Sequence, residues 1–217
     1  MYYDPRRDPH GLKHNPMTAL VAPRPIGWIS TVSRAGVVNL APYSFFNLVS
    51  GGPPFVMFSS KTRKDSQRNA EETGEFVYNM ATYELRDAVN LSSTEWGPGI
   101  SEPERIGLEM ARCREVKPPR VARSPVALEC RHFKTVELVS SDGTRNQSSV
   151  VIGEVVGIHI DDSAIVNGHV ELTRVQPLAR LGYMDYCAVN EVFAIDRPDK
   201  PAPEASAEDA VLARAWR

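Results

Sequence analysis

The chain has 217 residues, of which 42% are hydrophobic and 24% are charged, a composition typical of a soluble globular protein with one core. Its 25 Lys and Arg residues nearly balance 27 Asp and Glu residues, so it lacks the basic excess of a nucleic-acid-binding surface. No apolar run reaches the roughly 18–20 residues of a membrane span.

The N-terminal residues 1–23 are polar and interrupted by prolines, which predicts an arm rather than a helix, and the first sixteen lack the apolar core of a secretory signal. We place the arm at residues 1–15 and a single domain at 16–196. Residues 25–41 predict a hairpin, because two β-rich runs flank a turn. The stretch 39-NLAPYSFFNLVSGGPP-54 continues this strand or forms the next one.

After the short apolar run at 55–60, the sequence changes from strand-forming to helix-forming residues. The sequence 61-KTRKDSQRNAEETG-74 has good helix formers and no β-branched run, which predicts a helix. Thr62 and Asp65 match an N-terminal capping pattern, and Gly74 occupies the position of a left-handed C-terminal cap. Only Ala70 is clearly apolar inside this segment, so we expect the helix to lie on the surface.

The second half of the chain is again rich in strand patterns. A short helix is expected at 83–92, and the Gly- and Pro-rich, locally basic segment 97–125 is interpreted as a lid or, alternatively, a solvated loop. Further strands are expected at 75–81, 126–138, 149–160, 169–175 and 190–195, before a Pro- and Ala-rich tail at 197–217. About six to eight strands at hairpin spacing predict an all-β fold with short helices, a small barrel.

Cysteines and histidines show no metal-binding spacing. Cys113, Cys130 and Cys187 are odd in number and far apart, without a CxxC motif, and the histidines form no HExxH motif. Disulfides and a zinc site are therefore not expected. A reducing cytoplasm is the expected location. His132 and His159 are interpreted as packed or surface strand residues.

One arrangement has the chemistry of an anion site. In 59-SSKTRKDS-66, two hydroxyls end a strand and a helix begins at once, with Lys61, Arg63 and Lys64 around its first turn. Free N–H groups, the positive end of the helix dipole and nearby cations together favour a phosphate. The alternative is that Thr62 and Asp65 only cap the helix while the cations are solvated.

The stretch around Pro42 has the features of a strand that meets a flat, redox-active ring. Pro42 cannot donate to a ladder, so strand pairing is expected to be interrupted there, while Asn39, Ser44 and Asn47 offer polar contacts. The alternative is an edge strand whose Asn and Ser residues bond locally. No GxGxxG, GxxxxGK[ST] or GxSxG motif occurs, which leaves binding, or chemistry carried by a bound cofactor.

Ordered motifs along the chain resemble the flavin reductase-like family of FMN-binding split barrels. The resemblance rests on 24-RPIGWISTVSRAGVVNLAPYSFFN-47, FSS…KDSQRN…GEFVYNM, VALEC, VVIGEVVGIHID and 180-RLGYMDY-186, and it spans roughly residues 16–196. It implies a six-stranded antiparallel Greek-key split barrel that forms a homodimer with FMN near the interface. It also implies hydride transfer from NADH or NADPH to flavin.

The resemblance assigns site residues by position. It implies that FMN is bound by a set of residues on the interrupted strand and at the anion site: Asn39, Ala41, Pro42, Tyr43, Ser44, Asn47, Ser59, Ser60, Lys64, Asp65 and Ser66, with Arg24 as a further phosphate candidate. It implies a dinucleotide near Arg180, Gly182, Tyr183 and Tyr186. Trp28 is interpreted as core or dimer interface, and Cys187 as a small buried residue.

Two departures bear on the nicotinamide. Many relatives have Gly-Asp-His before the long strand, but 143-GTRNQSSVVIG-153 has no His, and a common Gly-Gly pair is Gly182-Tyr183 here. The first hypothesis is an NAD(P)H:flavin oxidoreductase that passes electrons to a flavin, a partner oxygenase or another acceptor, without a catalytic side chain. The alternatives are an FMN-binding electron carrier or sensor, or a dimeric binding module without catalysis.

Overall fold

The computed structural model describes residues 1–7, 10–97 and 99–196. The strands are β1 (Arg24–Pro25), β2 (Gly27–Val32), β3 (Val38–Tyr43), β4 (Phe46–Gly51), β5 (Pro54–Lys61), β6 (Glu75–Met80), β7 (Met110–Ala111), β8 (Arg120–Val121), β9 (Val126–Val139), β10 (Arg145–Ile160), β11 (Ile165–Val166), β12 (His169–Val170), β13 (Leu178–Arg180) and β14 (Tyr186–Ala188). The helices are α1 (Met17–Leu20), α2 (Asp65–Thr73), α3 (Arg86–Leu91), α4 (Glu102–Arg105), α5 (Leu172–Val175) and the 3₁₀ turn η1 (Asp162–Ala164).

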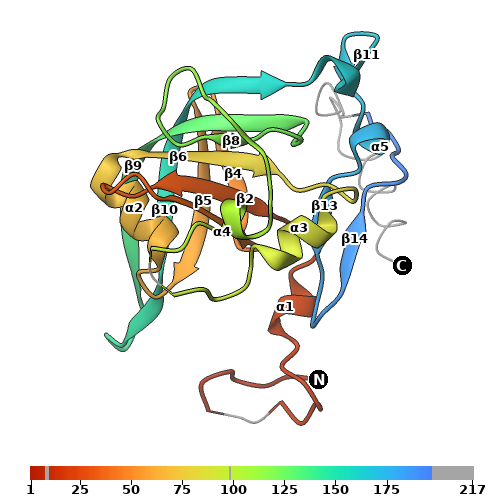
Figure 1. Cartoon of the computed structure of the whole chain (residues 1–217). Helices are drawn as coiled ribbons and strands as arrows, with labels where there is room; N and C mark the ends of the chain where they lie inside the picture. Colours follow the sequence, from red (N-terminus) through yellow and green to blue (C-terminus); the bar gives the residue numbers. More distant parts are fainter. Residues whose placement is uncertain (8–9, 98, 197–217) are drawn as a thin grey trace, which may run out of the picture.

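Seven antiparallel strands form the main sheet in the order β3-β2-β6-β9-β10-β5-β4. The two outer strands, β3 and β4, are consecutive in the chain and are joined by Ser44 and Phe45 alone. The sheet therefore curls back on itself, and the N–H of Ser59 on β5 donates to the carbonyl of Phe45 at 2.8 Å. The predicted antiparallel barrel is confirmed (Figure 1), with seven strands in the sheet rather than six.

Aromatic residues fill the barrel. Phe58 and Phe76 are fully buried and lie edge to face at 5.4 Å, and the Phe46 ring stacks on Tyr78 at 4.5 Å. Trp28 is also fully buried, which confirms its interpretation as a core residue, and its Nε1 donates to Ser92 Oγ at 2.8 Å. None of the helices in the described parts of the chain has the length and apolarity needed to cross a membrane.

The polar helix α2 is not a surface helix as expected. Ser66, Gln67, Asn69 and Ala70 are buried against β2 and β6. Asn69 Nδ2 donates to Thr31 Oγ1 at 3.1 Å, so side-chain hydrogen bonds replace the apolar contacts that hydropathy would require. The predicted C-terminal cap at Gly74 is confirmed, with φ of 78° and its N–H on the carbonyl of Ala70.

Several other expectations need correction. The helix begins at Asp65 with Lys64 as N-cap and no side-chain cap, while Thr62 has a left-handed φ of 61°, so Thr62 does not cap it. Of the predicted strand 169–175, only β12 is extended, because the Glu171 side chain accepts from Thr173 N and starts α5. Residues 190–195 are exposed and pair with no strand of the described chain. The predicted tail, 197–217, lies outside the described residues.

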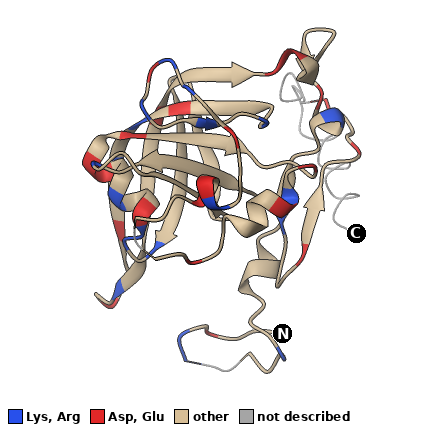
Figure 2. Cartoon of the chain, viewed as in Figure 1, with Lys and Arg blue, Asp and Glu red and all other residues tan. Residues whose placement is uncertain are grey.

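The irregular segment 97–125 is short of regular structure, as its prolines and glycines indicated, but much of it is anchored. We call residues 110–121 the strap; it contains β7 and β8 and crosses the barrel beside β6. Val121 N donates to Asn79 Oδ1 at 2.7 Å, and Ser30 Oγ donates to the carbonyl of Pro119 at 2.6 Å. Lys, Arg, Asp and Glu residues are interspersed over the elements rather than gathered by sign (Figure 2).

Replacing Gly153 with Ala is expected to destabilise the fold by about 1–3 kcal/mol, because an overpacked core must shift. A Cβ at this position of β10 would lie 2.3 Å from Cε1 of Phe76 and 3.2 Å from the carbonyl oxygen of Arg131. The matched control is Gly51→Ala on β4, where nothing lies within 4 Å of the new methyl. Urea unfolding measures both; equal stabilities of the two variants would contradict the prediction.

Candidate functional site

A cavity of about 330 Å³ lies between the β3 edge, the start of α2 and the loop that follows α3. Seven of the predicted cofactor residues line it together: Asn39, Ala41, Pro42, Tyr43, Lys64, Asp65 and Ser66. The remaining wall is made by Ser92, Ser93, Thr94, Glu95, Trp96 and Glu102. Two separate stretches of sequence, predicted independently as a ring-facing strand and an anion site, therefore meet in one cavity.

The strand wall is continuous, contrary to the expected interruption at Pro42. β3 pairs with β2 along its whole length, and Pro42 lies opposite Trp28. Leu40 N donates to Glu102 Oε2 at 2.9 Å, so this N–H faces away from β2. Because the bonding direction alternates along an antiparallel strand, the nitrogen of Pro42 also faces the open edge, where no ladder bond is lost. At Leu40 and Pro42 this edge thus presents carbonyl oxygens but no free N–H.

Glu102 is a buried carboxyl in the cavity wall. It begins α4, and only 8% of its surface is exposed. Burial raises the pKa of this carboxyl above its ordinary value of 4.5, while the N–H of Leu40 lowers it and the charge of Asp65 raises it further. The cavity therefore contains an acid that holds its proton to higher pH than a surface glutamate.

Replacing Glu102 with Gln is expected to remove the loss of folding stability that accompanies ionisation of this buried carboxyl. A carboxyl whose pKa is raised by folding binds more protons in the native state, so stability falls as pH rises above 4.5 through the raised pKa. The Gln side chain is neutral and its amide oxygen can still accept from Leu40. The difference in free energy of unfolding, variant minus wild type, should therefore increase between pH 4.5 and about pH 7.

Urea unfolding at the two pH values measures this difference. The matched control is Glu104→Gln, which makes the same change of charge at an exposed residue of the same helix. An E102Q difference that shrinks with rising pH would contradict the assignment.

A chain of polar side chains connects the strand to the helix. Asn39 Nδ2 donates to Ser66 Oγ at 2.8 Å. The Tyr43 phenol interacts with the hydroxyls of Ser66 and Ser60; burial raises the pKa of Tyr43, and these two hydroxyls oppose it. The Tyr43 ring packs on Phe58 at 4.8 Å. The cavity floor is thus rigidly hydrogen-bonded on one side and supported by the core on the other.

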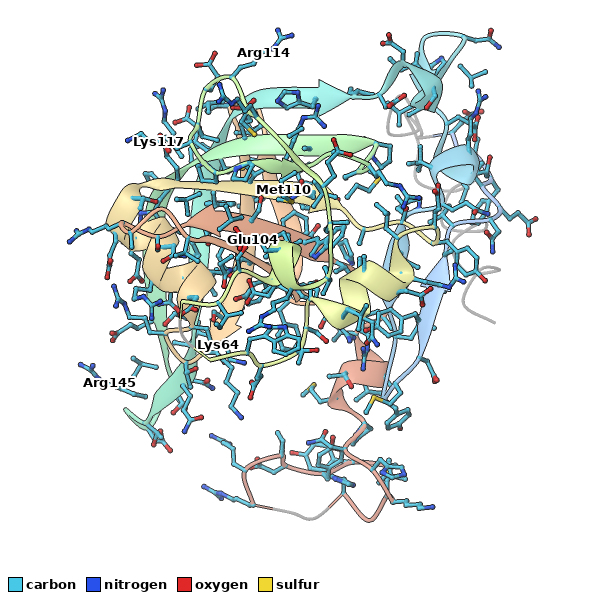
Figure 3. The ribbon with its side chains drawn as sticks, viewed as in Figure 1. Lys64, Glu104, Met110, Arg114, Lys117 and Arg145 are labelled. Atoms are coloured by element: carbon cyan, nitrogen blue, oxygen red, sulfur yellow. The ribbon has the colours of Figure 1, made fainter. Side chains whose placement is uncertain are left out.

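The start of α2 has the properties of an anion site. No side chain of the described residues caps the helix, so the N–H groups of its first turn stay available to a ligand. Lys64 points into the space below α2 and α4 (Figure 3), and its Nζ donates to Glu95 Oε1 at 2.7 Å. Glu95 is exposed and lies on the loop across the cavity, so a bound phosphate would compete with it for the ammonium group.

Other predicted cofactor residues do not line the cavity. Ser60 is buried, and its hydroxyl donates to the carbonyl of Thr62 at 3.0 Å, close behind the cavity through Tyr43. Ser44, Asn47 and Ser59 lie on or beside β4 and β5, and the Asn47 amide oxygen accepts from Leu48 N. Arg24 donates to the carbonyls of Thr18, Val21 and Leu181. This guanidinium joins α1 to the β13–β14 hairpin instead of facing the anion site.

The residues predicted to meet a dinucleotide form a separate group. Arg180, Gly182, Tyr183 and Tyr186 lie in the β13–β14 hairpin and do not line the cavity. The Arg180 guanidinium donates to the Tyr186 hydroxyl and lies 4.3 Å above its ring. Tyr186 instead lines another cavity, of about 480 Å³, with Tyr83, Arg86 and Val89. The two cavities share no lining residue: Arg86, Val89 and other residues of α3 line the larger one, and the C-cap Ser92 lines the smaller.

Two parts of the wall were missed by sequence reasoning. The loop Ser92–Trp96 follows the predicted helix at 83–92 and carried no pattern of its own. Glu102 lies in the segment interpreted as a lid, and an isolated glutamate in the sequence contains no signal of its burial. The Arg105 guanidinium lies 5.9 Å from the Trp96 ring centre, so this wall is held by contacts within the 92–105 segment.

Comparison with known proteins identifies relatives. Residues 19–178 match the family described as "Flavin reductase like domain". A protein from Aquifex aeolicus (strain VF5) is 36% identical over 169 residues, which covers 75% of this chain and 83% of that protein. The family match at 19–178 includes the β3 edge, α2 and the loop after α3.

Two solved structures share the fold. Nitrilotriacetate monooxygenase component B from Bacillus cereus has a TM-score of 0.83 and 27% identity, covering 90% of this chain and 98% of that chain. A protein with a split barrel domain from Shewanella frigidimarina NCIMB 400 has a TM-score of 0.74 and 19% identity, covering 84% of this chain and 90% of that chain. The curled seven-stranded sheet is therefore a split barrel.

Proposed function

This chain belongs to the flavin reductase-like family, and from this premise we propose that it is an FMN-dependent oxidoreductase that accepts hydride from NADH or NADPH. The observation that carries the proposal is the meeting of the β3 edge and the uncapped start of α2 in one cavity. A planar ring next to a phosphate-bearing chain needs this combination of an apolar strand edge and an anion site.

The residues in the cavity fit FMN by their chemistry. The first turn of α2 with Lys64 and Ser66 would hold the phosphate, as N–H groups and a cation suit a dianion. Ala41 and Pro42 would form an apolar wall for the ring, and the carbonyls of the β3 edge would accept from its imide N–H. Asn39 and Tyr43 would hold polar groups between the two ends. Five further residues would contribute to FMN binding from outside the cavity wall, or through neighbouring residues: Ser44, Asn47, Ser59, Ser60 and Arg24.

When bound, FMN supplies a ring that accepts hydride from a nicotinamide and passes electrons on. The task of this chain is to orient that ring and to keep water away from one of its faces. Trp96 and the 92–95 loop can cover the cavity from the side opposite α2, and Glu102 holds its proton close to the strand edge. No side chain is required to attack the substrate, so we assign no catalytic nucleophile.

We further propose a cytoplasmic homodimer with FMN near its interface. We propose that the nicotinamide dinucleotide meets Arg180, Gly182, Tyr183 and Tyr186 beside the cavity that Tyr186 lines together with α3. For the electron acceptor, the likeness to a monooxygenase component B favours a partner oxygenase, with free flavin as the other acceptor.

The deciding experiment is an anaerobic titration of the FMN-loaded protein with NADH and with NADPH. We expect the purified protein to be yellow, or to become yellow with FMN, and to bleach with one nicotinamide. Protein that stays colourless with excess FMN would overturn the proposal.

The separation of the hairpin residues from the cavity favours one further candidate, an FMN-binding electron carrier without efficient nicotinamide turnover. Fast bleaching by dithionite, but by neither nicotinamide, would identify this carrier. The last alternative is a binding module without flavin. In that case, replacing Ser59 and Ser60 with Ala would leave both partner binding and FMN content unchanged.

A further inference from the structure

A second group of chemically active side chains lies away from the flavin cavity. Cys113 of the strap, Glu129 of β9 and His159 of β10 each point one ligand atom toward a common space, and these atoms all lie within 4.8 Å of one another. Glu129 and His159 also line a cavity of about 470 Å³. This cavity shares no lining residue with the flavin cavity.

Glu129 organises the group. Its side chain is 1% exposed, and its carboxylate accepts from the N–H groups of Arg114, Glu115 and Val116 at 2.6–3.1 Å. The strap is therefore folded onto this carboxylate, and Cys113 is held directly before the bonded N–H groups. Figure 3 shows Met110, Arg114 and Lys117 marking the course of the strap across the barrel.

His159 approaches from the neighbouring strand. Its Nε2 lies 2.5 Å from Glu129 Oε1, while the Leu128–Ile158 and Ala127–His159 pairings fix β9 against β10. The ring is half-buried, so the imidazole is held by the fold and still borders the cavity. All three side chains are thus positioned by the backbone of three distant segments.

We propose that Cys113, Glu129 and His159 form a binding site for a zinc ion. Thiolate, imidazole and carboxylate are the ligands that Zn²⁺ takes in proteins, at roughly 2.0–2.3 Å. A tetrahedral ion separates such ligand atoms by about 3–4 Å, which small side-chain movements from the observed arrangement achieve. On binding, Zn²⁺ displaces the thiol proton of Cys113, which passes to water, and takes the Nε2 lone pair of His159, whose single ring proton is then carried by Nδ1.

The charges around the group fit an open site. Two anionic ligands, the Cys113 thiolate and the Glu129 carboxylate, neutralise the ion. Three protein ligands leave a fourth position, which is typical of zinc sites that bind a further molecule. Arg114 and Arg120 line the adjoining cavity, and the buried Nε of Arg120 has no hydrogen-bond partner among the described residues. A hydroxide or a small carboxylate or phosphate at the fourth position would meet these cations.

The test uses the full-length chain, freed of metal with a chelator and titrated with Zn²⁺ against a coloured competing chelator. We expect one Zn²⁺ per chain. Cys113→Ser and His159→Gln should each weaken binding by roughly 100-fold, since loss of even an outer-shell partner costs 10–100-fold. Gln at 159 can still donate to Glu129, so this variant preserves the strap. Cys187→Ser, a half-buried cysteine of β14, is the matched control and should bind as wild type.

Cobalt gives a second readout that does not involve flavin reduction. Co²⁺ added to the metal-free protein should produce a thiolate-to-metal absorption band that is present in Cys187→Ser and absent in Cys113→Ser. Zn²⁺ should raise the melting temperature of the wild type and leave that of Cys113→Ser unchanged. Failure to bind Zn²⁺ in a one-to-one ratio, or equal affinities of Cys113→Ser, His159→Gln and wild type, would overturn the proposal, whatever the outcome of flavin binding.

Discussion

Replacing Lys64 with Glu is expected to weaken FMN binding by at least about 30-fold, or about 2 kcal/mol, because a charge-assisted hydrogen bond is lost and a like charge faces the phosphate. Lys64 is the N-cap of α2 and lines the cavity together with Asp65 and Ser66. The added carboxylate would also stand close to Glu95, its present ion-pair partner at 2.7 Å. Quenching of FMN fluorescence on titration with protein measures the dissociation constant.

The matched control is Lys61→Glu. Lys61 ends β5 three residues earlier and is exposed, but it does not line the cavity. The control makes the same change in net charge, so any general electrostatic effect appears in both variants and is screened by salt. Equal losses in the two variants would show that the phosphate is bound elsewhere on this basic segment.

Replacing Glu129 with Ala is expected to destabilise the protein by about 3–5 kcal/mol, because buried partners of a removed charge are left without bonds. Three backbone N–H groups of the strap and the His159 ring converge on this carboxylate. Without it, the strap loses its anchor on β9. Protease cleavage between residues 110 and 121 should therefore accelerate together with the loss of stability.

Urea unfolding in the presence of a chelator measures this effect independently of any metal. Glu137→Ala, on the same strand β9, is the control, because its side chain is exposed and forms a surface ion pair with Arg145. A surface change of this kind is expected to stay within about 0.5 kcal/mol. If Glu129→Ala lowers the free energy of unfolding by no more than Glu137→Ala does, the carboxylate does not hold the strap. Should the Ala variant fail to fold, Glu129→Gln tests the same carboxylate at constant size.

The class of fold, and the two segments that meet in the cavity between β3 and α2, could be predicted from local sequence. Alternating β-rich runs and turn residues predict an antiparallel barrel, since side-chain periodicity is a property of each strand alone. The segment from Ser59 to Ser66 contains its own anion chemistry, because a helix start and its cations are adjacent in the chain. The motifs around Asn39 and Pro42 predicted the strand that forms the second wall of this cavity.

Long-range contacts account for the errors. The side chains of α2 look solvated in the sequence, and their burial depends on Asn39 and Thr31, which lie on other elements. Pro42 was expected to break the pairing of β3. Whether it does depends on which edge of the strand its nitrogen faces, and here β3 pairs with β2 along its whole length. Arg24 has the charge for a phosphate, yet its guanidinium donates to the nearby carbonyls of Thr18 and Val21 and to that of Leu181, 157 residues away.

The chain alone therefore specifies where strands, turns and the helix start lie, because these depend on neighbours within a few residues. The partners of its buried polar groups depend on the folded structure. Glu102 meets Leu40 across 62 residues, and Glu129 meets His159 across 30. Such bonds form only once the barrel has brought distant segments into contact and excluded water from between them. Burial then makes Glu102 an acid in the wall of the cavity between β3 and α2, and makes Glu129 an anchor of the strap.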